Sequence, residues 1–361
     1  MTKLLSCVKS CALLLAVLTL GGCVVTSLGK LHVINARVDP EGQALELLVA
    51  RESRYMTEPS VNDVWKTLHY ALYAVNLPAA DWSADWRSVE GKSRKILSFN
   101  GPPPRNVDYH YADGTLFTTN YGPGSALHTV QTTGLQWCAI QPDNTCKAVG
   151  EVDLTRSDGR VAHDRDGRHF FAAHQLFASD RAQPLLHVTG RPGYQQFLRE
   201  RDALDRPMLV ERRWLLAASH LSRRPGTPIL HIYDLERDTV ETVLAQTLAL
   251  KGLPILVAVD KDEQGWQLLM QFSACKEVDY NKEGGKNSEA GKKVVCDHTY
   301  GIQRPGHSQL ELLQIPPDRK VDITWRVDFG HWDSRRKRLW LFEAINKYDK
   351  ARGIEVKAVR Y

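Results

Sequence analysis

Two stretches of the sequence, FFAAHQLFASDRAQPLLHV at residues 170–188 and WLLAASHLSRRPGTPILHI at residues 214–232, align without a gap at a spacing of 44 residues. Apolar residues coincide at the start of the two stretches, and Leu186-His187 falls on Leu230-His231 near their ends. Each stretch reads as an apolar strand, a polar turn and a second strand led by Leu-His. A strand–turn–strand unit of this period is typical of one blade of a β-propeller.

Weaker copies of this unit recur along the chain. Leu-His pairs stand at 31–32, 68–69 and 127–128, further first strands at 115–117, 266–269 and 339–342, and further second strands at 310–313 and 354–356. Asp-Gly turn signals separate many of them, and about six units can be counted. Only the segment from Tyr194 to Leu204 has helical spacing. The sequence therefore predicts an all-β fold, a β-propeller of six or seven blades, with a two-domain β-sandwich as the alternative.

Five histidines follow a leucine in this repeat: His32, His69, His128, His187 and His231. Equivalent positions of a propeller are related by its axis, so inward-pointing imidazoles would form a ring around the channel, a candidate metal or anion site. The alternative is that each imidazole packs between blades or bonds to a neighbouring carbonyl. We favour the second interpretation and predict no metal site.

The N-terminal segment has the pattern of an export signal. Lys3 and Lys9 accompany an apolar run at residues 11–20, which is too short to span a bilayer. The run ends in Leu20-Gly21-Gly22-Cys23, which resembles the lipobox of bacterial lipoproteins, whose cysteine is diacylated and becomes the new N-terminus. The resemblance implies a signal peptide at 1–22, a lipidated tether at 23–30 and a single repeat domain at 31–361.

The residue after the lipobox cysteine is Val24 rather than an aspartate. By the sorting pattern of these lipoproteins, this implies a lipid anchor in the outer membrane, with the folded body on its periplasmic face. The chain has 47 basic and 42 acidic residues, and removal of Lys3 and Lys9 leaves 45 against 42. A chain so close to neutral offers no broad electrostatic footprint for nucleic acid, and no nucleic-acid partner is predicted.

Four of the seven cysteines remain after the signal peptide and Cys23 are set aside: Cys138, Cys146, Cys275 and Cys296. An even number in an oxidising compartment predicts two disulfides. Three pairings are open, and the sequential one is the most economical. It would close a Pro-Asp-Asn turn between the first two cysteines and confine a polar loop between the last two.

The same polar loop, at residues 276–295, is the first candidate contact surface, because loops carry function more often than strands do. Its candidate binding residues are Lys282, Lys286, Lys292 and Lys293. A second candidate is the run at residues 335–338, with Arg335, Arg336 and Arg338, which could face an acidic partner or anionic headgroups. A solvated turn is the alternative interpretation of that run.

No sequence motif indicates an enzyme. A nucleophile elbow is absent, and the glycine that a phosphate-binding loop needs before Gly91-Lys92-Ser93 is Trp86. Residues 164–167 resemble part of a calcium loop, but Ala162 and Ala173 stand where its first and last ligands should be. We predict no catalytic residue and no cofactor.

In layout, the chain resembles the immunity lipoproteins that protect bacteria from type VI secreted lipases. The shared features are the lipobox, a disulfide-bonded all-β body and the absence of an enzyme motif. The resemblance implies a protein that binds a secreted lipase toxin and neutralises it by stoichiometric occlusion. Two alternatives are an envelope-assembly scaffold and a propeller glycosidase, for which Asp180, Asp234, Asp260 and Asp328 would be candidate acids.

Overall fold

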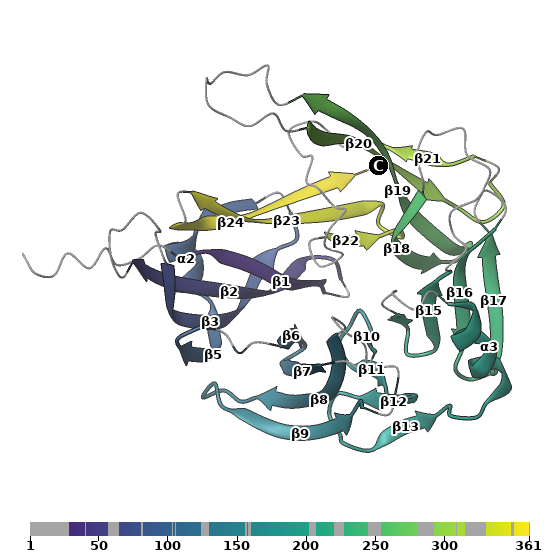
Figure 1. Ribbon diagram of the computed structural model, residues 1–361, viewed down its shortest axis with the longest axis horizontal. Helices are drawn as coiled ribbons and strands as arrows, with labels where there is room; N and C mark the ends of the chain where they lie inside the picture. The colour runs from purple at the N-terminus through teal and green to yellow at the C-terminus, as the bar shows by residue number, and fades with distance from the viewer. Residues whose placement is uncertain are drawn as a thin grey trace, which may run out of the picture.

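The computed structural model describes residues 29–360, with gaps at 40, 57–64, 81, 103, 105, 124–129, 156, 158–159, 202–206, 220–226, 245–253, 280–291, 308, 315–329 and 348–349. The described residues form six four-stranded antiparallel sheets arranged around one axis (Figure 1). The fold is therefore a β-propeller of six blades. The prediction of an all-β propeller is confirmed, and the β-sandwich alternative is wrong.

The blades follow one another along the chain. Blade 1 consists of β1 (Leu31–Val38), β2 (Ala44–Met56), β3 (Trp65–Pro78) and β5 (Arg94–Asn100), blade 2 of β6 (Val107–Ala112), β7 (Thr115–Pro123), β8 (Val130–Ile140) and β9 (Cys146–Asp153), and blade 3 of β10 (Val161–His163), β11 (His169–Ala172), β12 (Gln175–Ala178) and β13 (Pro184–His187). Blade 4 consists of β14 (Met208–Val210), β15 (Trp214–Ala218), β16 (Pro228–Asp234) and β17 (Thr239–Leu244), blade 5 of β18 (Pro254–Asp262), β19 (Gly265–Asp279), β20 (Lys292–Gln303) and β21 (Glu311–Leu313), and blade 6 of β22 (Gly330–Asp333), β23 (Arg338–Lys347), β24 (Lys350–Arg360) and β4 (Trp82–Asp85). The first strands lie nearest the axis, where β1 contacts β6 and β22, β10 contacts β14, and β18 contacts β22.

Six apolar cores hold the ring together, and each lies between two neighbouring blades. The second strand of a blade contributes side chains to both of the cores that flank the blade, because successive side chains of a strand point to opposite faces. Phe170 packs into the core between blades 2 and 3, while Phe171 packs into the core between blades 3 and 4. Leu268 and Leu269 divide in the same way between the two cores beside blade 5. Runs of adjacent apolar residues therefore mark strands that are buried on both faces.

The ring is closed by a segment inserted into blade 1. β4 follows β3 in the chain but pairs antiparallel with β24, where Gly353 lies opposite Asp85 and Val356 opposite Trp82. The short helix α2 (Trp86–Glu90) continues from β4 and buries Trp86 in the core between blades 1 and 6. A side chain at residue 353 would meet the backbone of Ala84, so this pairing requires glycine there. Blade 6 is thus completed by an early part of the chain.

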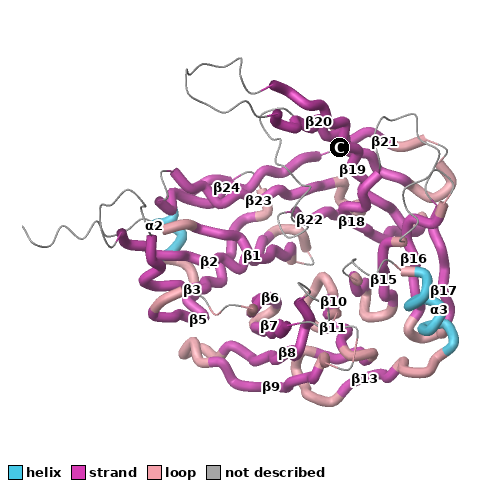
Figure 2. Tube along the Cα trace, viewed as in Figure 1, coloured by secondary structure: helices cyan, strands magenta, loops and turns pink. Residues whose placement is uncertain are grey.

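The predicted helical segment is also present. Helix α3 (Pro192–Glu200) begins with proline in its first turn and buries Tyr194 and Phe197 between blades 3 and 4. It and α2 are the helices of the described residues, which otherwise form strands and loops (Figure 2). No helix within those ranges is long and apolar enough to cross a membrane.

In the repeat at residues 170–188 and 214–232, only the first parts of the two stretches occupy equivalent strands. Phe170 and Trp214 both lie on second strands, β11 and β15, as the alignment requires. His187, however, lies on the fourth strand of its blade, whereas His231 lies on a third strand. His32 and His69 lie on a first and a third strand, and His128 is outside the described residues. The Leu-His histidines are therefore not equivalent, and the described ones do not form a ring.

Cys138 and Cys146 form a disulfide between β8 and β9, with Cα atoms 5.4 Å apart. This is the first bridge of the sequential pairing. Cys275 and Cys296 lie opposite each other in the register of β19 and β20. Their bridge stays a prediction, which peptide mapping of the unreduced protein would test.

Replacing Cys138 and Cys146 together by serine is expected to lower the free energy of unfolding by about 2.5 kcal/mol. The bridge spans a sequence separation of 8 residues, and its loss frees that loop in the unfolded chain. Urea denaturation of the variant and of the native protein, with and without reductant, measures the effect. An unchanged stability in the double variant would show that the turn holds its shape without the bridge.

Candidate functional site

One end of the propeller is formed by short turns. The turns joining first to second strands lie at residues 39–43, 113–114, 164–168, 211–213, 263–264 and 334–337. Antiparallel strands reverse at each turn, so the turns joining third to fourth strands, such as 235–238 between β16 and β17, lie at the same end. We call this end the short-turn face. It is rich in charged residues, and their partners come from several blades.

Asp260 connects three blades on the short-turn face. It lies near the end of β18, the inner strand of blade 5, and is only 5% exposed. One carboxylate oxygen accepts from the Arg165 guanidinium of blade 3 at 2.8 Å, and the other accepts from the backbone N–H of Ser334 in blade 6 at 2.7 Å. Arg165 also donates to the carbonyl oxygen of Val259 at 3.1 Å. Charge-assisted bonds of this kind are the strong ones among protein hydrogen bonds.

Two more arginines extend this network to blades 1 and 4. Arg37 of blade 1 donates to Glu46 and to the carbonyl oxygen of Asp166 in blade 3, at 3.0 and 2.7 Å. Arg335 of blade 6 pairs with Glu211 of blade 4 at 2.8 Å and donates to the carbonyl oxygen of Lys261. Several of these contacts join blades that are not neighbours. The short-turn face is therefore cross-linked from blade to blade by charged groups.

The predicted basic residues divide between the two ends of the molecule. Arg335 and Arg336 lie in the turn between β22 and β23, where Arg336 pairs with Asp333 at 2.6 Å, and Arg338 begins β23. Lys292 and Lys293 begin β20 at the opposite end of blade 5. Lys282 and Lys286 lie outside the described residues. The two predicted patches are thus separate, and the arginines at 335 and 336 already have acidic partners.

A pocket of about 360 Å³ opens between blades 4 and 5 on the short-turn face. We call it the blade 4–5 pocket. It is lined by Arg213, Trp214, Ile232, Asp234, Arg237, Thr239, Glu241, Lys261 and Trp266. Three cationic and two acidic side chains surround it, beside two tryptophans. The sequence did not predict this site, because its residues come from two blades and no local motif joins them.

The two tryptophans form a corner that holds a lysine. Trp214 and Trp266 meet edge to face, with ring centroids 5.5 Å apart. The Nζ of Lys261 lies 3.3 Å from the centroid of Trp214 and 5.1 Å from that of Trp266, in cation–π contact. Burial lowers the pKa of Lys261 from its ordinary value. Within the described part of the chain, no carboxylate pairs with this ammonium group.

Asp234 fixes the other wall of the blade 4–5 pocket. Arg213 donates to it from Nε and from Nη2, at 3.1 and 2.6 Å to the same oxygen. Arg237 also lies beside it, at 4.0 Å. These hydrogen bonds hold the pKa of Asp234 below its usual value, against the opposing effect of burial. Asp234 and Asp260, both considered as glycosidase acids, are therefore partners of arginines, while Asp328 lies outside the described residues.

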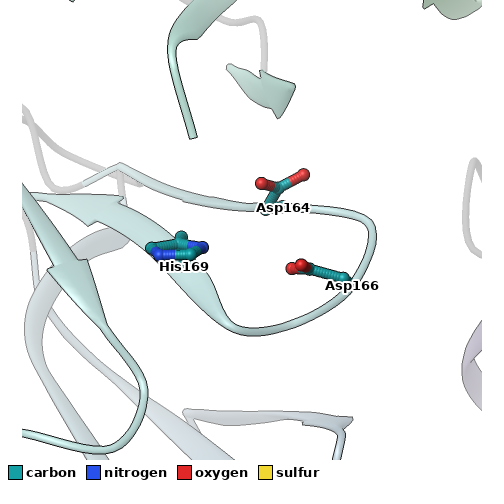
Figure 3. Close-up of side chains that lie close together, drawn as sticks. All are labelled: Asp164, Asp166 and His169. Atoms are coloured by element: carbon teal, nitrogen blue, oxygen red, sulfur yellow. The ribbon is translucent and has the colours of Figure 1, made fainter. Parts of the chain in front are cut away.

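A cluster of possible metal ligands lies in the turn between β10 and β11. Ligand atoms of Asp164, Asp166 and His169 all lie within 4.8 Å of one another (Figure 3). The oxygens of Asp164 accept from the backbone N–H groups of Arg165 and Arg212, each at 2.7 Å. Burial, together with the charge of Asp166, raises the pKa of Asp164 to about 6. Asp164 thus ties the turn of blade 3 to that of blade 4.

Two histidines stack between the inner strands of blades 2 and 3. The rings of His110 and His163 are nearly parallel, with centroids 4.0 Å apart, and both contact Phe117. The Nδ1 atom of His163 is buried and has no hydrogen-bond partner among the described residues. Burial, with a smaller effect of Arg37, lowers the pKa of His110 to about 4. Burial also lowers the pKa of His163.

We expect this pair to make the protein less stable in acid. A histidine whose pKa is lower in the folded state binds more protons when unfolded, so its contribution is complete above about pH 6.5 and declines toward pH 4. Urea denaturation should show an additional loss, on the order of 2 kcal/mol between pH 7 and pH 4.5, in the native protein relative to His110→Phe. Equal losses in both proteins would mean that other groups control the acid response.

Comparisons with known proteins do not assign this chain to a family. The sequence matches no protein-family description and no curated protein. Among solved structures, the chain is similar to a mannose phosphorylase from Leishmania mexicana in complex with phosphate ion, at 8% identity and a TM-score of 0.28. The likeness covers 93% of this chain and 84% of the other. At this level it supports no argument about activity.

Proposed function

We propose that this chain is a periplasm-facing lipoprotein that binds a protein partner through its short-turn face. The observation that carries the proposal is the blade 4–5 pocket, where tryptophan and arginine side chains border a cavity in a cross-linked surface. Tryptophan and arginine are enriched among the residues that dominate binding energy at protein interfaces. A surface whose side chains are already held in place loses less conformational entropy on binding, and this favours affinity.

The partner that we propose is a secreted lipase toxin, neutralised by stoichiometric occlusion. The support is the lipobox at Leu20 to Cys23, which predicts export and a lipid anchor, and the resemblance in layout to immunity lipoproteins. Occlusion requires a rigid surface of ordinary interface size, about 800 Å² on each partner. It requires no reactive group on this chain, only a surface that covers the active site of the toxin.

The test uses the exported chain with Cys23→Ser, so that the protein is soluble. It is immobilised and exposed to the purified products of neighbouring genes, and captured proteins are identified by mass spectrometry. A lipase that binds at a 1:1 ratio and loses activity on binding supports the proposal. Capture of an outer-membrane assembly protein would favour the scaffold alternative instead. Absence of binding at micromolar concentration would overturn the proposal.

A matched pair of charge reversals locates the binding face. Arg237→Glu changes the rim of the blade 4–5 pocket, whereas Lys147→Glu changes an exposed residue of β9, the outer strand of blade 2. The first is expected to weaken partner binding at least tenfold, about 1.4 kcal/mol, and the second to leave it unchanged. Equal effects of the two substitutions would place the contact elsewhere.

Lipidation is tested independently of the partner. Mass spectrometry of the N-terminal peptide should find Cys23 as the first residue, carrying two acyl chains. Cys23→Ala should release the protein from the outer membrane into the soluble periplasmic fraction, because the acyl chains supply the anchoring energy, about 0.8 kcal/mol per buried methylene. A variant that stays in the membrane fraction would contradict the assignment of the anchor.

A further inference from the structure

The blade 4–5 pocket has a net charge of +1, because Arg213, Arg237 and Lys261 stand against Asp234 and Glu241. Asp234 is already bonded to Arg213 from two nitrogens and also lies 4.0 Å from Arg237. Among the described residues, no hydrogen bond or ion pair joins the ammonium group of Lys261 to a carboxylate, although the charges of Glu211, Glu241 and Asp234 act on it from further away. Its ammonium group has three donors, and the contact with Trp214 uses the face of a ring rather than an acceptor oxygen. The pocket therefore presents donors that an anionic ligand could accept from.

The surroundings of Lys261 strengthen this preference. Its ammonium group is partly withdrawn from water by the two tryptophans, and burial lowers its pKa. In such surroundings an anion bound beside the ammonium interacts more strongly with it than in open water. A cationic ligand, by contrast, would have to displace the lysine from the faces of Trp214 and Trp266. The electrostatics of the pocket thus favour a negatively charged group.

The walls and the size of the pocket indicate what carries that charge. The indole rings of Trp214 and Trp266 offer apolar surface directly beside the donors. The carboxylate of aspartate or glutamate is joined to a methylene stem, which can lie against such a surface while the oxygens accept from Lys261 and Arg237. About 360 Å³ is at the small end of ligand cavities and leaves ample room for one acidic side chain.

We propose that the blade 4–5 pocket receives the carboxylate of an aspartate or glutamate side chain presented by the protein partner. This inference rests on the proposed function. Lys261 and Arg237 supply the donors, and Trp214 and Trp266 line the pocket beside them. The acidic side chain is thereby the anchor of the interface, and the cross-linked turns around the pocket form the surrounding contact surface.

The first experiment measures the binding of an acidic peptide to the blade 4–5 pocket in the absence of the partner. The exported Cys23→Ser chain, labelled with ¹⁵N at its tryptophan indoles, is titrated with the blocked hexapeptide of glutamate, with that of glutamine and with free glutarate. Single tryptophan-to-phenylalanine variants assign the signals of Trp214 and Trp266. The glutamate peptide should shift these two signals, and the glutamine peptide should not. Saturation of the shifts gives the dissociation constant.

Substitutions then identify the donors. Lys261→Met should raise the dissociation constant for the glutamate peptide by about tenfold to a hundredfold, the range expected for one charge-assisted contact. Lys261→Arg should retain most of the binding. Lys147→Met, on the exposed outer strand of blade 2, is the control and should have no effect. Failure of the glutamate peptide to shift either signal, or an equal effect of Lys147→Met, would overturn the inference.

The partner itself separates this inference from the proposed function. Loss of partner binding in Lys261→Met, with retention in Lys147→Met, supports both. Partner binding that is unchanged in Lys261→Met overturns the pocket assignment while the binding function stands. If glutarate binds as tightly as the peptide and no partner is captured, the pocket is a site for free carboxylates. That result would overturn both the partner-derived carboxylate and the proposed function.

Discussion

Phe170→Ala is expected to lower the free energy of unfolding by about 4 kcal/mol, the largest effect of any single change considered for this protein. Phe170 is fully buried in the core between blades 2 and 3. Its ring stacks on Phe177 at a centroid distance of 5.1 Å and meets Trp137 and Phe117 edge to face at 4.8 and 5.2 Å. Removal leaves a cavity that these three rings cannot all collapse to fill.

The size of the effect should depend on volume. Phe170→Leu retains most of the buried apolar volume and is expected to cost about 1.5 kcal/mol. Urea denaturation followed by tryptophan fluorescence compares the two variants, since Trp137 reports on this core directly. Losses of similar size for alanine and leucine would mean that the ring contacts, rather than the filled volume, stabilise the junction of blades 2 and 3.

Asp260→Ala is expected to lower the free energy of unfolding by about 3 kcal/mol. The substitution leaves the buried N–H of Ser334 without its acceptor and removes the acidic partner of Arg165. The two losses affect blades 3, 5 and 6 together. Asp180→Ala is the matched control, because that carboxylate is exposed and, within the described part of the chain, pairs with the adjacent Arg181 alone. Its removal should leave the free energy of unfolding essentially unchanged.

A double-mutant cycle measures how much of the stability lost in Asp260→Ala comes from its ion pair with Arg165. When Arg165→Met is combined with Asp260→Ala, no unpaired guanidinium remains, and the loss should be smaller than the sum of the two single losses by about 1 kcal/mol. Strict additivity would contradict an ion pair between the two residues. An Asp260→Ala variant as stable as Asp180→Ala would contradict the structural role of the whole contact.

The segments that the sequence predicted as the first strand of each unit are the second strands of the blades, and they were recognisable because those strands are buried on both faces. The segments at 115–117, 170–171, 214–215, 266–269 and 339–342 all belong to second strands of blades 2 to 6. Each contains adjacent apolar residues that serve two different cores. The other strands were harder to place, because an outer strand such as β9 is half exposed and its apolar pattern is weak. The Leu-His match of residues 186–187 and 230–231 joined a fourth strand to a third and was coincidental.

The candidate site could not be predicted in the same way. Arg335 pairs with Glu211, which is 124 residues away in the sequence, and Arg165 pairs with Asp260, which is 95 residues away. Charged residues in a turn have the same local pattern whether they face solvent or a distant blade. The run at 335–338 therefore looked like a free basic patch, although Arg335 and Arg336 are paired. Trp214 and Trp266 likewise meet only once blades 4 and 5 are side by side.

The pairing of β4 with β24 also determines when folding can finish. Gly353 and Asp85, which lie opposite each other in blade 6, are separated by 268 residues in the chain. Contacts of such long range form slowly, because a large loop must be ordered before they can be made. If the chain crosses a membrane from its N-terminus, as the signal peptide predicts, β4 is delivered early and β24 last, and the ring would stay open until translocation is almost complete. Until then β4 is an unpaired strand edge, and a chaperone that covers residues 82–85 would protect the nascent propeller from aggregation.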